Sequence, residues 1–95
     1  MKTRDKEIFH QRSRLEIIAC LLEKSYHGSR KTRLIYGCNL SLSQFKKYSG
    51  YLIEGDLLTK NKNEDGAEVY LTTEKGKEFL IDYERIKSTL DKISM

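Results

Sequence analysis

Apolar residues recur every three to four positions in the first third of the chain, which is the spacing of a helix with one buried face. The expected inward residues of this first helix are Leu15, Ile18, Leu21 and Leu22. Ser13 and Glu16 match a capping box, in which two side chains bond to backbone N–H groups at the start of a helix. We expect the helix to end before Gly28, in a turn over residues 27–29.

Two more amphipathic segments follow this turn. Residues 31–37 predict a short second helix, and Ser41 begins a third through a second capping box with Gln44. The predicted inward residues are Leu34, Ile35 and Cys38 in the first segment and Phe45, Tyr48 and Leu52 in the second. We expect Gly55 to end the third helix in the left-handed conformation, which glycine adopts at low cost.

The periodicity then changes from helical to extended. The predicted strands cover residues 57–61 and 68–71. Between them, residues 63–66 favour a hairpin turn, because the pair Asp65-Gly66 tolerates positive φ angles. Thr72 or Thr73 is expected to cap a last helix that runs almost to the C-terminus.

The order of three helices, a β-hairpin and a last helix predicts a winged helix-turn-helix fold, mainly α with a small β-hairpin. A length of 95 residues fits one compact unit. We divide the chain into a basic N-terminal arm or helix extension (1–12), a winged-helix domain (13–76) and a C-terminal helix (77–95).

The last helix carries a separate apolar pattern. Its residues Phe79, Tyr83, Ile86, Leu90 and Ile93 follow one another at intervals of 4, 3, 4 and 3. This spacing is that of a coiled-coil seam about two heptads long. Pairing with a second copy of the chain is therefore expected, with residues 77–95 as the dimerisation helix, and packing of the helix on its own core is the alternative.

Charge is distributed unevenly along the chain. Residues 1–47 contain eleven Lys and Arg against four acids, a net charge of +7, whereas the remainder carries −3. A basic half of this kind favours a polyanionic partner, and a solvated surface is the alternative. No apolar run has the length of a membrane span or a secretory signal, so we expect a soluble, cytoplasmic protein. If the polyanionic partner is DNA, the protein is nucleoid-associated.

The residue types that carry catalysis or bind metals form no recognisable motif. Cys20, Cys38, His10 and His27 lack the spacing of a zinc site. We expect two small buried thiols, with a Cys20–Cys38 disulfide as the alternative. No glycine-rich phosphate loop and no nucleophile motif is present, so we expect no enzyme activity, no cofactor and no small-molecule substrate.

The third helix is the candidate recognition helix, because the second helix of a helix-turn-helix pair enters the major groove with its N-terminal residues near the bases. Its candidate DNA-binding residues are Ser41, Ser43, Gln44, Lys46 and Lys47. Candidate phosphate contacts are Arg30, Lys31 and Arg33 before and within the second helix, and Lys60 and Lys62 in the hairpin. These positions make residues 13–76 the expected DNA-binding domain. The acidic hairpin tip, with Glu64 and Asp65, would be repelled by DNA.

Several of these motifs together resemble a known family. A signature of archaeal winged-helix proteins resembles the run Lys31-Thr-Arg-Leu-Ile-Tyr-Gly-Cys-Asn-Leu-Ser41. The rest of that signature matches two later runs, Gly55-Asp-Leu-Leu and Tyr70-Leu-Thr-Thr-Glu-Lys-Gly76. The likeness is greatest to small, basic, chromatin-associated DNA-binding proteins of the 10a type. It implies a homodimer that binds double-stranded DNA and is joined by an antiparallel coiled coil of its C-terminal helices. The acidic hairpin tip and a shorter last helix depart from that family.

Two functions remain in competition. One is a dimeric DNA-binding protein that acts as a transcription regulator or organises DNA. The other is a winged-helix module that binds a partner protein, since a fold does not determine a function.

Overall fold

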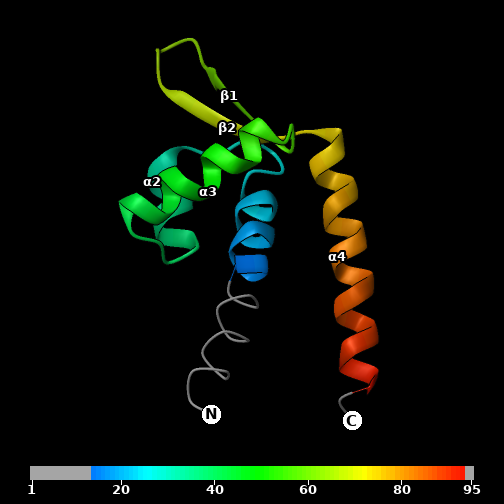
Figure 1. The fold of residues 1–95 in the computed structure, drawn as a ribbon. Coiled ribbons are helices and arrows are strands. Elements are labelled where there is room, and N and C mark those ends of the chain that lie inside the picture. Colours follow the sequence, from blue (N-terminus) through cyan, green and yellow to red (C-terminus); the bar gives the residue numbers. More distant parts are fainter. Residues whose placement is uncertain (1–13, 94–95) are drawn as a thin grey trace.

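The computed structural model describes residues 14–93, and Figure 1 shows their arrangement. Residues 14–24 form the described part of the first helix. The remaining elements are α2 (Lys31–Gly37), α3 (Leu42–Glu54), β1 (Leu58–Lys62), β2 (Glu68–Thr72) and α4 (Glu74–Ile93). The predicted order of elements is confirmed. The predicted N-terminal arm (1–12) and the Ser13 part of the first capping box lie outside the described residues.

The core forms where the C-terminal half of the first helix meets α2, α3 and the hairpin. Its fully buried large side chains are Leu21, Leu22, Leu34, Phe45 and Leu58. Helices α2 and α3 contribute residues of the apolar faces that their periodicity predicted, and the first helix contributes the C-terminal part of its face. The early part of α4 adds one buried residue, Leu80, to this core.

Leu15 is not part of this core, and the expectation that it faces inward is wrong. Its side chain is 40% exposed. The buried positions of the first helix begin at Ala19, because α2, α3 and the hairpin cover only its C-terminal half. Leu15 instead lines a surface hollow together with Tyr83 and Ile86 of α4.

The two strands form an antiparallel hairpin that begins one residue later than expected, with Leu58 opposite Thr72 and Lys62 opposite Glu68. An isolated bridge adds a third segment that the sequence analysis missed. The N–H of Ser29 donates to the carbonyl of Tyr70 at 2.9 Å, and the N–H of Tyr70 donates back at 2.8 Å. The turn before α2 is thereby attached to β2.

The end of α3 differs from the prediction in its left-handed residue. Gly55 has φ −82°, and Asp56 takes the positive φ of 62° instead. The N–H of Leu57 donates to the carbonyl of Leu52 and the N–H of Asp56 to that of Ile53, which is a Schellman motif. Its left-handed position falls one residue after Gly55, so the expected role of Gly55 is wrong.

Cys20 and Cys38 form a disulfide, so the expectation of two free thiols is wrong. The bond joins the first helix to the C-terminal cap of α2. Both residues are only half-buried. The sequence contained both options, and only the folded chain brings the two cysteines together, with 5.9 Å between their Cα atoms.

Helix α4 begins against the hairpin and then runs beside the first helix, with which it lines surface hollows. The hydroxyl of Thr73 accepts the N–H of Gly76 at 3.0 Å, so Thr73 is the capping residue. A Cβ added to Gly76 would overlap the carbonyl oxygen of Leu57 and lie 2.6 Å from Cγ2 of Thr72. The missing side chain is what allows the helix to approach the hairpin so closely.

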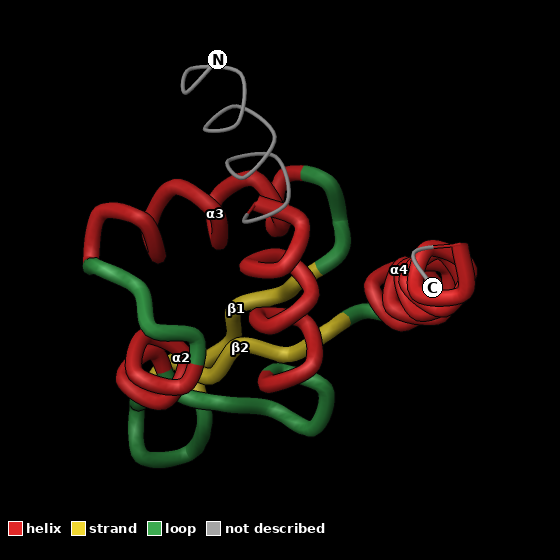
Figure 2. Tube along the Cα trace, turned by 90° about the horizontal axis from the view of Figure 1, so that it is seen from below, coloured by secondary structure: helices red, strands yellow, loops and turns green. Residues whose placement is uncertain are grey.

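Seen along its axis in Figure 2, α4 stands beside the rest of the domain as a separate rod. The helix is continuous from Glu74 to Ile93, so the division between residues 76 and 77 corresponds to no break and stays a prediction. No helix within residues 14–93 combines the length and the apolar character that crossing a membrane requires.

Candidate nucleic-acid interface

The start of α3 is held by the predicted capping box. The N–H of Gln44 donates to Oγ of Ser41 at 3.1 Å, and the N–H of Ser41 donates to Oε1 of Gln44 at 2.9 Å. One face of the helix is anchored in the core by Phe45, Tyr48 and Leu52, as predicted. These two constraints set both the position and the rotation of α3.

The opposite face of α3 is exposed and carries the candidate recognition residues. Ser43 and Lys47 lie four positions apart and therefore one above the other, on the side away from the core. Lys46 is exposed on a flank. Gly50 extends the same outward stripe, and a Cβ added there would meet nothing within 4 Å. The outward surface of α3 is therefore cationic and open.

Gln44 is exposed, but its carbonyl oxygen is already used by the capping box. A bidentate contact with adenine needs both the oxygen and the nitrogen of the amide. Gln44 would have to leave the box to make that contact. In the structure, Gln44 stabilises the first turn of α3 through the capping box. This turn leaves Ser43 and Lys47 facing outward.

The start of α2 presents the second group of cations. Arg30 is the N-terminal cap residue, and Lys31 and Arg33 lie in the first turn of the helix. All three side chains are exposed, and no acidic residue lies in that turn. Lys31 and Arg33 form no ion pair with another described residue.

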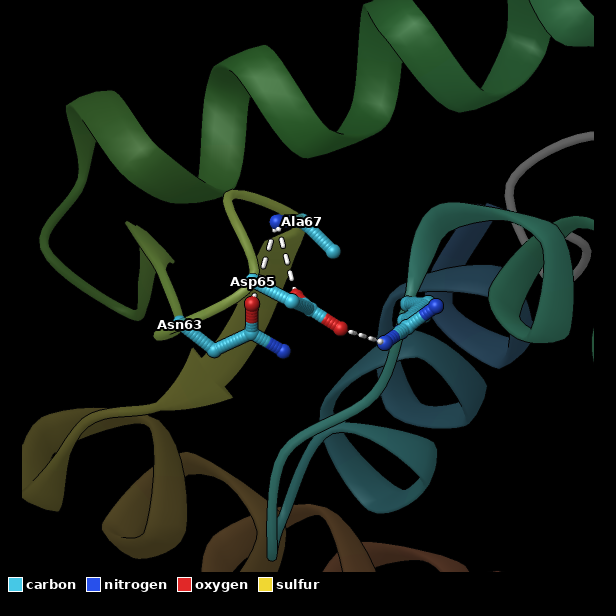
Figure 3. A network of polar contacts seen from close by, with 4 residues as sticks. Asn63, Asp65 and Ala67 are labelled. Atoms are coloured by element: carbon cyan, nitrogen blue, oxygen red, sulfur yellow. Dashed lines mark hydrogen bonds and ion pairs between the residues drawn. The ribbon is translucent and has the colours of Figure 1, made fainter.

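Arg30 does have a partner, which sequence reasoning missed. Its Nη2 donates to Oδ2 of Asp65, at the hairpin tip, over 3.1 Å. Figure 3 shows the other side of this contact, where Asn63 and Asp65 both turn a side-chain oxygen toward the N–H of Ala67. Thirty-five residues separate Arg30 from Asp65, so no local pattern could have revealed the pair.

The two hairpin lysines differ in their surroundings. Nζ of Lys60 lies 3.5 Å from a carboxylate oxygen of Glu68, whereas Lys62 forms no ion pair with another residue in the described range. Lys62 is therefore the better candidate for a phosphate contact.

Tyr70 connects the hairpin to α3. Its ring meets that of Phe45 edge-on, with 5.3 Å between the centroids. Burial raises the pKa of the Tyr70 phenol above its ordinary value, while Lys60 lowers this pKa and Glu68 raises it by smaller amounts. The contact with Phe45 links the position of the hairpin to that of the candidate recognition helix.

The five predicted dimerisation residues fall into two environments. Phe79 and Tyr83 are half-buried against the core, whereas Ile86 is 55% exposed and Ile93 is 74% exposed. Leu90 lies between these two positions and is also exposed. Within residues 14–93, no group of three or more His, Cys, Asp or Glu side chains is placed to hold a metal ion.

The chain is similar to known proteins in both sequence and structure. Residues 11–91 match a family model described as winged helix-turn-helix. The DNA-binding protein Sso10a-2 from Sulfolobus solfataricus has a similar structure, with a TM-score of 0.58 and 28% identity over 84% of this chain and 90% of that chain. The predicted resemblance to the 10a type is confirmed. No curated protein matches the chain.

Two bacterial structures share the fold. The adhesin competence repressor AdcR from Streptococcus pyogenes has a TM-score of 0.63 and 23% identity, over 85% of this chain and 61% of that one. A mutant of ZitR from Lactococcus lactis has a TM-score of 0.61 and 22% identity, over 85% and 58%. The match spans about three fifths of each of these chains, and at this identity it shows the fold alone.

Proposed function

We propose that this chain, which belongs to the winged helix-turn-helix family, binds double-stranded DNA as a homodimer and acts as a transcription regulator or DNA-organising protein. The observation that carries the proposal is the outward face of α3. Its buried stripe and its capping box leave Ser43 and Lys47 exposed on the side away from the core and Lys46 exposed on a flank. A helix presented in this way suits insertion into the major groove.

The cations at the start of α2 support the same proposal. Lys31 and Arg33 are exposed and contact the DNA backbone in this arrangement, which adds affinity without selecting a sequence. Lys62 adds a third contact of this kind from the hairpin. Sso10a-2, to which the chain is similar, is itself a DNA-binding protein.

The second half of α4 supports the homodimer. Ile86 and Ile93 continue the apolar seam beyond the part of α4 that packs on the core formed by residues 14–93. An α4 helix from a second copy would bury this seam, as a and d residues do in a coiled coil. The antiparallel arrangement follows the resemblance to the 10a type.

Titration of a short labelled duplex, followed by fluorescence anisotropy at increasing salt, tests DNA binding. We expect binding at micromolar protein in low salt, with an affinity that falls steeply as salt rises, because phosphate contacts release counterions. Absence of binding by the wild-type chain in low salt would exclude the proposal.

A pair of double variants tests the role of α3. Lys46→Glu with Lys47→Glu is expected to weaken binding by at least about tenfold, since it places two acids at the groove. Arg85→Glu with Lys92→Glu is the matched control, because it changes the net charge equally at exposed positions of α4. Equal losses in the two variants would mean that α3 is not the reading helix and would favour the protein-interaction module.

A further inference from the structure

The hairpin tip contacts Arg30, which is one of the candidate DNA-binding residues. Asp65 carries the carboxylate that contacts this side chain, and both residues are largely exposed, at 60% for Arg30 and 64% for Asp65. Arg30 is one of the cations expected at the DNA backbone. A phosphate oxygen and a carboxylate oxygen accept the same hydrogen bonds from a guanidinium group.

The backbone holds these two side chains close to each other. Ser29, next to Arg30, is bonded in both directions to Tyr70 of β2, which brings the start of α2 alongside the hairpin. Oδ1 of Asp65 accepts the N–H of Ala67 at 3.1 Å, which fixes the carboxylate and turns Oδ2 toward Arg30. The hairpin turn therefore orients the carboxylate of Asp65 toward Arg30.

We propose that the Asp65 carboxylate occupies the place on Arg30 that a DNA phosphate would take, so that it acts as a built-in competitor and lowers the affinity for DNA. This inference rests on the proposed DNA-binding function. An exposed ion pair contributes little to stability, so a phosphate can displace the carboxylate at small cost. The same pair explains how an acidic tip can lie beside a DNA-facing surface, since Arg30 compensates one of its charges.

The test compares Asp65→Asn with Glu64→Gln. Asparagine keeps an Oδ1 that can accept the N–H of Ala67 but loses the charge that holds Arg30. Glu64 is the adjacent exposed acid and forms no ion pair with another described residue, so Glu64→Gln changes the net charge equally without releasing Arg30. Binding of each full-length variant to one duplex is measured over a series of salt concentrations.

We expect Asp65→Asn to bind about two- to fivefold more tightly than Glu64→Gln, which corresponds to the loss of one exposed ion pair. The slope of log affinity against log salt should steepen by up to about 0.9 in Asp65→Asn, because one more phosphate contact forms without competition. In an Arg30→Gln background, the gain from Asp65→Asn should disappear.

Two results would overturn the inference while leaving the proposed function intact. In one, Asp65→Asn and Glu64→Gln bind equally, which would assign the whole effect to net charge. In the other, Asp65→Asn binds DNA more weakly than wild type, which would mean that the ion pair stabilises the hairpin in the conformation that binds DNA. If neither wild type nor Asp65→Asn binds DNA in low salt, the proposed function and the inference both fail.

Discussion

The two halves of α4 carry the same apolar spacing but meet different surroundings. In the first half, Gly76 and Leu80 are buried against the hairpin and the core. In the second half, Ile86 and Ile93 remain exposed. Figure 1 shows that the C-terminal end of α4 reaches past the described start of the first helix. A 3.6-residue period shows that a helix has an apolar face, but it does not show what covers that face.

The difference has a simple geometric origin. The core reaches only as far along α4 as the hairpin and the C-terminal half of the first helix extend, so among the described residues no side chain of α4 after Tyr83 belongs to the core or packs against it. Substitutions in the first half should therefore act on folding, and those in the second half on association.

The largest expected effect is on association. Ile86→Asp with Ile93→Asp would place four carboxylates in the apolar seam of a dimer, and an unpaired buried charge costs several kcal/mol. We expect the variant to be monomeric by light scattering at concentrations where wild type is dimeric.

Ile81→Asp is the control for placing an acid at an exposed apolar position of α4. Ile81 is 54% exposed, almost the same as Ile86, but lies on another side of α4. The control should remain a dimer. A wild-type chain that is monomeric at high concentration would remove the coiled-coil proposal altogether.

The next effect concerns the glycine that lets α4 approach the hairpin. Gly76→Ala should lower the free energy of unfolding by about 3 kcal/mol, because the new methyl group overlaps the backbone carbonyl of Leu57. Urea denaturation measures this loss. Gly50→Ala, made in open space on α3, should raise the free energy of unfolding by about 0.5–1 kcal/mol. Similar behaviour of the two variants would mean that the close contact at Gly76 is absent.

Adjacent residues of α4 provide a finer comparison. Leu80→Ala should cost about 2–3 kcal/mol of unfolding free energy, since Leu80 is buried in the core. Ile81→Ala should change it by at most about 0.5 kcal/mol, as is usual for exposed positions. Equal losses, again by urea denaturation, would show that the domain covers more of α4 than the structure indicates.

The smallest expected effect is a dependence of the free energy of unfolding on pH, caused by Tyr70 in the core against which the first half of α4 packs. Burial raises the pKa of Tyr70 in the folded chain, so the unfolded chain loses this proton first as the pH increases. Stability should therefore fall from about pH 10 upward, where an ordinary tyrosine ionises. Urea midpoints of wild type should decrease more steeply over this range than those of Tyr70→Phe. Identical slopes would show that Tyr70 makes no such contribution.

Much of the fold could be predicted from local patterns. The buried stripe of α3 and the capping box of Ser41 with Gln44 appear in the structure as expected, because periodicity and caps depend on residues within a turn of one another. One error was also local. The left-handed residue after α3 is Asp56 and not Gly55, since the Schellman hydrogen bonds determine which residue takes that conformation.

The candidate interface was only partly predictable. That Lys46 and Lys47 would face outward followed from the position of the buried stripe. That Arg30 is paired with Asp65 followed from no sequence pattern. That the side-chain oxygen of Gln44 is occupied at the start of α3 was already implied by the predicted capping box.

The sequence by itself determined which segments are helices and strands, which face of each is apolar and where charge accumulates, because these properties depend on neighbours in the chain. Only the tertiary structure decided that Cys20 bonds to Cys38, that Asp65 forms an ion pair with Arg30 and that the core ends partway along α4. Each of these depends on the distance in space between residues that the chain keeps far apart. That distance is set by how the whole core packs.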